Sequence, residues 1–233
     1  MKLGIMQPYF FPYLGYWQLM NAVDTYIVYD DVNFIKGGRI NRNEILINNQ
    51  AKFINLILSG ASPNKHINEV IVDNNEVQKR KLLSKITMSY SKAPYYNDVM
   101  PIIEDIVGQN EINLGKYLFY SFKKIGEYLG INTKLMLSSE INKNLALKGK
   151  EKVIDICKRL KADTYYNSVG GMDLYDKEEF KENGLNLVFL KMDSDIKYKQ
   201  FNEEFVPNLS ILDVMMFNSQ EECKKMLKRY TLI

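Results

Sequence analysis

The opening 32 residues restrict the fold more than any other part of the chain. Residues 2–7 have a strand pattern, two prolines at positions 8 and 12 mark a tight loop, and residues 13–23 carry a polar position every third residue, as amphipathic helices do. Residues 25–32 form a second strand pattern, rich in β-branched and tyrosine residues. Two strands joined through a helix in one sheet run parallel, with a right-handed crossover. The sequence therefore predicts an α/β protein.

Strand and helix patterns alternate through the rest of the chain. We expect further strands at 53–58, 132–138, 164–169 and 185–191, and helices at 76–90, 113–129, 150–160 and 220–230. Residues 76–130 are all helical in pattern, and we interpret them as an insertion or lid. The expected fold is a single α/β domain over residues 1–233, with one doubly wound, Rossmann-like parallel sheet and this helical insertion.

Composition excludes several classes of protein. Apolar residues make up 46% of the 233 residues and aromatic residues 12%, which excludes a disordered chain. No apolar run approaches the roughly 18 residues of a membrane-spanning helix, and no leader pattern opens the chain. The 31 basic and 28 acidic residues give a net charge of only +3, too low for a nucleic-acid-binding domain. We expect a cytoplasmic protein without membrane insertion or a nucleic-acid partner.

Cysteine and histidine chemistry is not indicated. Cys157 and Cys223 each lie among apolar residues at helical spacing, which predicts buried core positions. His66 is the single histidine, and no Cys-x-x-Cys or His-Glu-x-x-His pattern is present, so the sequence predicts neither a metal site nor a histidine relay.

The loop after the first strand is the first candidate site. Ligands of open parallel sheets bind beyond the carboxyl ends of the strands. A helix begins there, and a helix start can bind an anion through its free N–H groups. The candidate ligand-binding residues of this loop are Gln7, Tyr9, Tyr13 and Tyr16. The alternative is an aromatic loop packed into the core, which we favour for Phe10 and Phe11.

A second candidate site follows the second strand. Asp30 and Asp31 end that strand, and a glycine pair at 37–38 follows with three cations and an asparagine nearby. Glycines allow close approach of a ligand to the backbone, and lysine and arginine bind phosphate. The predicted phosphate-binding residues are Lys36, Arg39, Asn41 and Arg42. The alternative is a solvated charged surface.

Polar groups in the last third of the chain complete the candidates. Asn167, Gly170 and Gly171 follow a predicted strand, where they could bind phosphate or form a turn. Asn208, Ser210 and Asp213 lie among apolar residues and are candidates for either binding or helix capping. Asp213 is costly to bury without a partner, so we expect it to be hydrogen-bonded.

Four segments of the chain resemble the WbqC-like protein family. They are residues 6–16 (MQPYFFPYLGY), 36–43 (KGGRINRN), 92–96 (KAPYY) and 204–210 (EFVPNLS). The resemblance runs over the whole chain. It implies a role in bacterial surface-polysaccharide synthesis, including O-antigen pathways with modified amino sugars.

The layout of the first strands is also similar to class I nucleotidyltransferases such as pantothenate synthetase. Those enzymes have a His-x-Gly-His signature where this chain has residues 13–16 (YLGY), so both histidines are replaced by tyrosine. The histidines stabilise developing phosphate charge, a role that Lys36, Arg39 or Arg42 could fill here.

These resemblances imply an enzyme that modifies a nucleotide-linked amino sugar, by acyl or aminoacyl transfer to the sugar amine. Asp30 or Asp213 would position or deprotonate the amine. The alternatives are a non-catalytic module that binds the sugar nucleotide, and a glycosyltransferase for which Asp193-Ser194-Asp195 would be the metal-binding run. The sequence leaves open whether ATP is used and whether the chain forms a homo-oligomer, and it indicates no metal.

Overall fold

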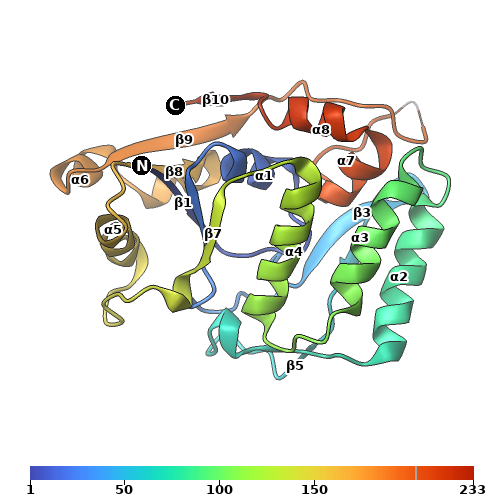
Figure 1. The fold of residues 1–233 in the computed structure, drawn as a ribbon, viewed down its shortest axis with the longest axis horizontal. Coiled ribbons are helices and arrows are strands. Elements are labelled where there is room, and N and C mark those ends of the chain that lie inside the picture. The colour runs from blue at the N-terminus through green and yellow to red at the C-terminus, as the bar shows by residue number, and fades with distance from the viewer. Residues whose placement is uncertain (203) are drawn as a thin grey trace.

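A six-stranded sheet occupies the left half of the view in Figure 1, with the helices of residues 76–129 to its right. The computed structural model describes residues 1–202 and 204–233. The sheet contains β1 (Lys2–Met6), β2 (Thr25–Val28), β7 (Lys134–Leu137), β8 (Thr164–Ser168), β9 (Asn186–Met192) and β10 (Tyr230–Leu232). Their order is β10-β9-β8-β1-β2-β7. All neighbours pair in parallel except β9 and β10, which are antiparallel.

The strand order reverses direction once, beside β1. From β1 the chain moves outward to β2 and then β7, and it later returns to the other side of β1 to form β8 and β9. Leu3 pairs with Thr25 on one side of β1, while Lys2 pairs with Thr164 on the other. At such a reversal the loops after the two central strands diverge and leave a crevice.

Helices cover both faces of the sheet. The α-helices are α1 (Leu14–Asn21), α2 (Glu76–Tyr90), α3 (Tyr96–Gly108), α4 (Leu114–Leu129), α5 (Gly149–Arg159), α6 (Lys177–Glu182), α7 (Ile211–Phe217) and α8 (Gln220–Met226). On one face, Cys157 of α5 and Phe180 of α6 pack with Ile5 of β1. On the other face, α1, α4, α7 and α8 contribute to a larger core, where Phe122 meets Trp17 and Tyr26 edge to face.

Two small antiparallel pairs lie outside the central sheet. They are β3 (Arg42–Ile47) with β4 (Gln50–Asn55), and β5 (Leu58–Ser59) with β6 (Ile71–Val72). Asn48 and Asn49 join β3 to β4 with φ of 49° and 61°, as a tight hairpin requires. Short 3₁₀ turns occur at η1 (Ile67–Glu69), η2 (Ser138–Glu140) and η3 (Val169–Leu174).

The structure confirms most predicted elements and corrects four. The sheet is mostly, not wholly, parallel, because β10 pairs antiparallel with β9. Residues 53–55 of the strand predicted at 53–58 belong instead to the β3–β4 hairpin, since four of the six β4 residues are exposed and could not lie inside a sheet covered on both faces. The strand predicted at 25–32 ends at Val28, and the helix predicted at 220–230 ends at Met226 so that Tyr230 can join β10.

The helical block predicted at 76–130 contains α2, α3 and α4. Because Phe122 of α4 packs against Trp17 and Tyr26, this helix contributes to the cover of the central sheet. The role of the block as a lid stays a prediction. No helix in the described part of the chain has the length and apolar character needed to cross a bilayer.

Both cysteines are core residues, as predicted. Cys157 and Cys223 are fully buried, and burial raises the pKa of each thiol to about 12. We expect Cys157→Ala and Cys223→Ala to lower the free energy of unfolding by about 1–3 kcal/mol, the cost of a small core cavity, and to leave ligand affinity unchanged. Urea denaturation and calorimetric titration measure the two quantities. Loss of ligand binding in a folded variant would contradict the core assignment.

Candidate functional site

A cavity of about 460 Å³ lies at the reversal of strand order, and we call it the switch-point cavity. Loops and strand ends on both sides of the reversal line it. The lining residues are Tyr9, Tyr13 and Gly15 after β1, Ser168 and Val169 at the end of β8, Leu190, Lys191 and Met192 of β9, and Arg39, Asn43 and Asn208. This is the place where open α/β sheets bind ligands.

Helix α1 begins at this cavity without a side-chain cap. Its N-cap residue is Tyr13, whose side chain makes no capping hydrogen bond. The N–H groups at the start of a helix lack the partner four residues earlier and attract anions; in α1, Tyr16 N–H already donates to Tyr13 O at 3.1 Å, so the N–H groups of Leu14 and Gly15 are the candidates for an anion. Gly15 lies in this first turn under the Tyr13 ring, and a Cβ at Gly15 would come within 2.5 Å of Tyr13 Cε2. Glycine at this position therefore leaves room for the Tyr13 ring beside the helix start.

Three of the predicted tyrosines form one cluster. Tyr9 stacks on Tyr16 with ring centroids 4.9 Å apart, and Tyr13 meets Tyr16 edge-on at 6.0 Å. Tyr16 is buried and donates its hydroxyl to the backbone oxygen of Gln7 at 2.9 Å. Burial raises the pKa of Tyr13 and, further, that of Tyr16, so both stay neutral. Tyr9 and Tyr13 reach the cavity, while Tyr16 and Gln7 support them.

Arg39 brings positive charge to the switch-point cavity. Its guanidinium donates to Glu44 Oε2 at 2.8 Å and to Asn43 Oδ1 at 3.3 Å, and it lies 4.9 Å from the centroid of the Phe53 ring. Asn43 is fixed in turn, because its Nδ2 donates to the backbone oxygens of Phe10 and Phe11 at 3.1 and 2.9 Å. Arg39 is therefore held in place before any ligand arrives.

The other predicted residues of this loop do not line the cavity. Arg42 lies over Phe53 at 4.5 Å and donates to the backbone of its own loop, to Gly38 O at 3.1 Å and to Gly37 O. Lys36 is exposed to solvent, and Asn41 donates to the backbone oxygen of Leu56 at 3.0 Å. Of the three predicted cations, Arg39 is the one that reaches the cavity.

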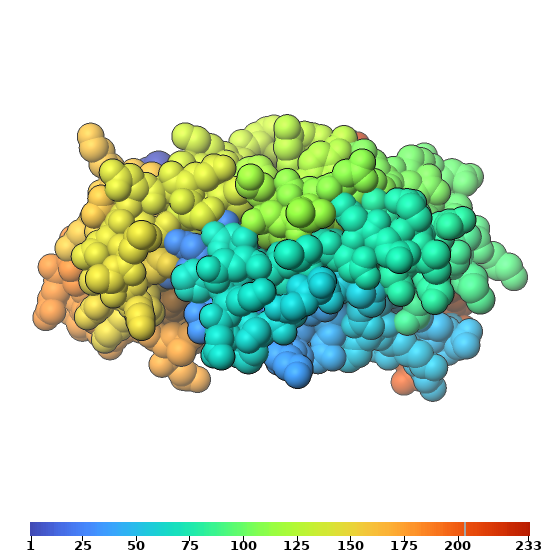
Figure 2. All heavy atoms as spheres, turned by 90° about the horizontal axis from the view of Figure 1, so that it is seen from below, coloured from blue at the N-terminus to red at the C-terminus, as the bar shows by residue number. Residues whose placement is uncertain are grey.

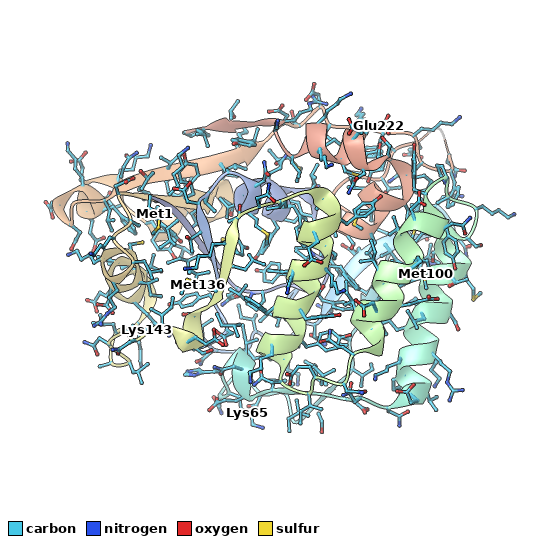
Figure 3. All side chains as sticks on the ribbon, in the orientation of Figure 1. Met1, Lys65, Met100, Met136, Lys143 and Glu222 are labelled. Atoms are coloured by element: carbon cyan, nitrogen blue, oxygen red, sulfur yellow. The ribbon has the colours of Figure 1, made fainter. Side chains whose placement is uncertain are left out.

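Asp30 and Asp31 connect the end of β2 to the segment after β7. Asp30 is buried, and its carboxylate accepts two hydrogen bonds from Ser139. The donors are the Ser139 N–H at 2.9 Å and the Ser139 hydroxyl at 2.6 Å. Asp31 Oδ2 accepts from Lys143 at 2.8 Å and from Lys152 at 3.1 Å. Figure 3 labels Lys143 beyond the end of β7, and Figure 2 shows the blue atoms of this part of the chain between the yellow α5 region and the teal η1 region.

The three charged side chains of this cluster are buried together. Lys143 is 1% exposed, Lys152 9% and Asp31 10%. Lys152 also donates to the backbone oxygen of Asp31 at 2.8 Å and lies over the Tyr29 ring. Burial raises the pKa of Asp31, but the contacts of its carboxylate with Lys143 and Lys152, together with the nearby Ser138 hydroxyl, lower it more, so its pKa is below the ordinary value of 3.8.

Asp213 is buried and hydrogen-bonded, as predicted. Its carboxylate accepts from the hydroxyls of Tyr90 at 2.8 Å and Tyr198 at 2.6 Å, and from Gln200 Nε2 at 2.7 Å. Burial raises its pKa more than these three hydrogen bonds lower it. Neither Asp30 nor Asp213 lines the cavity, so these contacts favour a positioning role for both; catalysis by either stays a prediction.

Of the candidate residues in the last third of the chain, one lines the switch-point cavity and the others lie outside it. The side chain of Asn167 lies against Gly171, so a Cβ added at Gly171 would come within 2.5 Å of Asn167 Nδ2. Gly170 is exposed to solvent. Ser210 caps α7 by accepting from Leu212 N, and it donates to the backbone oxygen of Phe11 at 2.8 Å. Asn208 alone among these residues lines the cavity, with the left-handed φ of 58°.

Sequence reasoning missed seven lining residues of the switch-point cavity. They are Gly15, Asn43, Ser168, Val169, Leu190, Lys191 and Met192. For the last five, the available signal was their position at the carboxyl ends of two predicted strands. Asp193 and Asp195, the formal metal-binding run, both face Arg229, at 3.7 and 2.6 Å. Within residues 1–202 and 204–233, no three acidic, histidine or cysteine side chains gather closely enough to hold a metal ion.

A second cavity of about 600 Å³ adjoins the first and shares Tyr13, Met192 and Asn208 with it. We call it the apolar cavity, because nine of its fourteen lining residues are apolar or aromatic, among them Leu14, Ile196, Tyr198, Phe205, Leu209 and Val214. Polar residues, among them Ser194 and Lys197, complete its lining. In the described part of the chain, neither cavity is lined by a residue of 76–130.

The fold and the site define an α/β protein with a mostly parallel sheet and a ligand-sized cavity at the reversal of its strand order. The chain belongs to the WbqC-like protein family, whose model matches residues 7–225. It is 26% identical, over 229 residues and 97% of each chain, to the uncharacterized protein Rv1507c of Mycobacterium tuberculosis (strain ATCC 25618 / H37Rv). No solved structure matches the chain.

Proposed function

We propose that the protein binds a nucleotide-linked amino sugar in the switch-point cavity and transfers an acyl or aminoacyl group to the sugar amine. The observation that carries the proposal is the meeting of Arg39 with the uncapped start of α1 in one cavity. A guanidinium and free helix N–H groups are two standard phosphate-binding devices. In this proposal the nucleotide lies at the reversal of strand order, as it does in Rossmann-like proteins.

The proposed reaction forms one amide bond. The amine nitrogen attacks the carbonyl carbon of an activated acyl donor, a C–N bond forms, and the bond from that carbon to the leaving group breaks. The nitrogen loses one proton to a base, and the leaving group departs with its electron pair. The family membership fits a role in bacterial surface-polysaccharide synthesis in the cytoplasm, where such sugars serve as precursors. The donor would be an acyl compound already activated, or one activated with ATP.

Arg39→Ala is the direct test of the phosphate site. We expect it to weaken binding of a nucleotide-linked amino sugar, such as UDP-glucosamine, by about 1.5–3 kcal/mol, the contribution of a hydrogen bond to a charged group. Arg39→Lys should recover only part of this loss, because an ammonium cannot make the planar two-point contact. Calorimetric titration measures the affinities.

Arg42→Ala is the matched control for this test. It removes the same charge from the same Phe53 ring but lies outside the cavity, so we expect the affinity to change by less than about 0.5 kcal/mol. Equal losses in both variants would show that the loop acts through its overall charge or its folding, and would contradict a specific phosphate contact at Arg39.

A non-catalytic binding module is the second candidate. This candidate is favoured because the carboxylates of Asp30 and Asp213, the two predicted bases, already accept hydrogen bonds from other residues of the protein. Incubation with amino-sugar nucleotides, acyl donors and ATP, followed by mass spectrometry, separates the two. A product heavier than the sugar nucleotide by the acyl group supports the enzyme, whereas tight binding without turnover supports the module.

A further inference from the structure

The apolar cavity is not used by the phosphate site and is larger than the switch-point cavity. Its wall comes from three parts of the chain: Leu14 at the start of α1, the segment after β9 with Ile196, and Val214 of α7. Ile196, Leu209 and Val214 are each less than a tenth exposed, so the apolar surface lines the interior of the cavity. A cavity of this size and lining is typical of a small-molecule site.

The wall of the apolar cavity is fixed by the Asp213 hydrogen bonds. Tyr198, which lines the cavity, donates to Asp213 at 2.6 Å. Gln200 donates to the same carboxylate, donates to the backbone oxygen of Val206 at 3.1 Å and accepts from its N–H at 2.8 Å. Tyr198 is thus tied to Asp213 directly, and Val206 is tied to it through Gln200. The cavity is preformed, so a ligand does not have to order its wall.

The two cavities meet at Tyr13, Met192 and Asn208, which line both. One ligand can therefore occupy them together, with its anionic end near Arg39 and its other end against apolar side chains. Resting on the proposed function, we propose that the apolar cavity binds the aliphatic acyl group that is transferred, while the phosphate of the substrate lies in the switch-point cavity. The donor is thereby narrowed to one with an apolar acyl group, and a ligand that carries both a phosphate and an apolar chain, as the acylated product does, would fill both cavities.

A series of n-alkyl phosphates tests this inference without knowledge of the natural nucleotide. Methyl, butyl, hexyl and octyl phosphate present one phosphate and an increasing apolar chain. We expect the dissociation constant to fall about fourfold for each methylene that enters the cavity, which corresponds to about 0.8 kcal/mol, and to level off when the cavity is full. Titration followed by NMR or calorimetry measures the affinity of each member.

Three variants separate the two cavities. Ser194→Trp places an indole in the apolar cavity from an exposed position, and it should flatten the dependence on chain length while leaving methyl phosphate affinity unchanged. Lys199→Trp, at an exposed neighbouring position outside the cavity, should keep the wild-type dependence. Arg39→Ala should weaken every member by the same factor and leave the chain-length dependence intact.

Each outcome decides one proposal. A flat series in the wild type, or a dependence that survives Ser194→Trp, would overturn the acyl-binding role of the apolar cavity and leave the phosphate site standing. The proposed phosphate site would be overturned instead if Arg39→Ala left all affinities unchanged while Ser194→Trp still removed the dependence on chain length. The inference is supported if the affinity of the wild type rises steeply with chain length and this rise is lost in Ser194→Trp but kept in Lys199→Trp.

Discussion

Asp31→Asn is expected to lower the free energy of unfolding by about 3–5 kcal/mol at pH 7, because it leaves Lys143 and Lys152 buried without their carboxylate. Urea denaturation measures the loss. Since the pKa of Asp31 is lower in the folded protein than in the unfolded chain, its contribution is complete above pH 3.8 and is lost as the pH falls through the folded pKa. The difference between wild type and variant should therefore shrink in acid.

An exposed ion pair provides the control for Asp31. Asp105 pairs with Lys124 at 2.8 Å, but the two side chains are 46% and 34% exposed. We expect Asp105→Asn to cost less than about 1 kcal/mol. The double variant Asp31→Asn with Lys143→Met should recover part of the loss, because it removes one of the two unpaired buried charges. A loss from Asp31→Asn no larger than that from Asp105→Asn would show that the cluster is open to water.

Asp213→Ala is the second large change, with an expected loss of about 3 kcal/mol at pH 7. It leaves the donors of Tyr90, Tyr198 and Gln200 without their shared acceptor, and buried donors without partners are costly. The pH dependence has the opposite sign to that of Asp31. Because burial raises the folded pKa of Asp213, its contribution is greatest below the unfolded pKa and falls as the pH rises through the folded pKa.

Tyr90→Phe and Tyr198→Phe divide the Asp213 effect between its partners. Each removes one hydroxyl donor to Asp213 and should cost about 1–2 kcal/mol; Tyr90→Phe also removes the acceptor of the Leu46 N–H at 3.0 Å, so its cost should lie at the upper end. Tyr198→Phe should also weaken octyl phosphate more than methyl phosphate, since Tyr198 lines the apolar cavity, whereas Tyr90 lines neither cavity. Equal effects of the two variants on the alkyl phosphate series would argue against a specific role of the Asp213 contacts in holding that wall.

The sequence predicts the central sheet well where each element has a clear period. The strands at 2–6, 164–168 and 186–192 and the helix at 76–90 lie within two residues of their predicted bounds. Helix α7 was missed because all seven of its residues, Asp213 included, are buried, so its apolar residues show no helical period. The strand β3 was missed because its first residues, Arg42 and Asn43, belong to a segment whose glycines and charges indicate a loop.

The sequence predicted where the switch-point cavity lies but not all of the residues that line it; that the cavity is a functional site stays a prediction. The rule that ligands bind at the carboxyl ends of parallel strands selected Tyr9, Tyr13, Arg39 and Asn208, which the structure brings together. Sequence alone could not separate Arg39 from Arg42, because the difference is where each guanidinium lies around Phe53. It also could not show that Asp30 accepts from Ser139, a contact between residues 109 positions apart.

The central place of β1 in the sheet has a consequence for synthesis on the ribosome. One edge of β1 pairs with β2, about 20 residues later, but the other edge pairs with β8, where Lys2 meets Thr164. At about 5–20 residues per second, roughly 8–30 s pass before that partner has been synthesised. Until then an apolar strand edge stays open to other chains. The centre of the sheet is thus completed only after β8 has been made, long after β1 and β2.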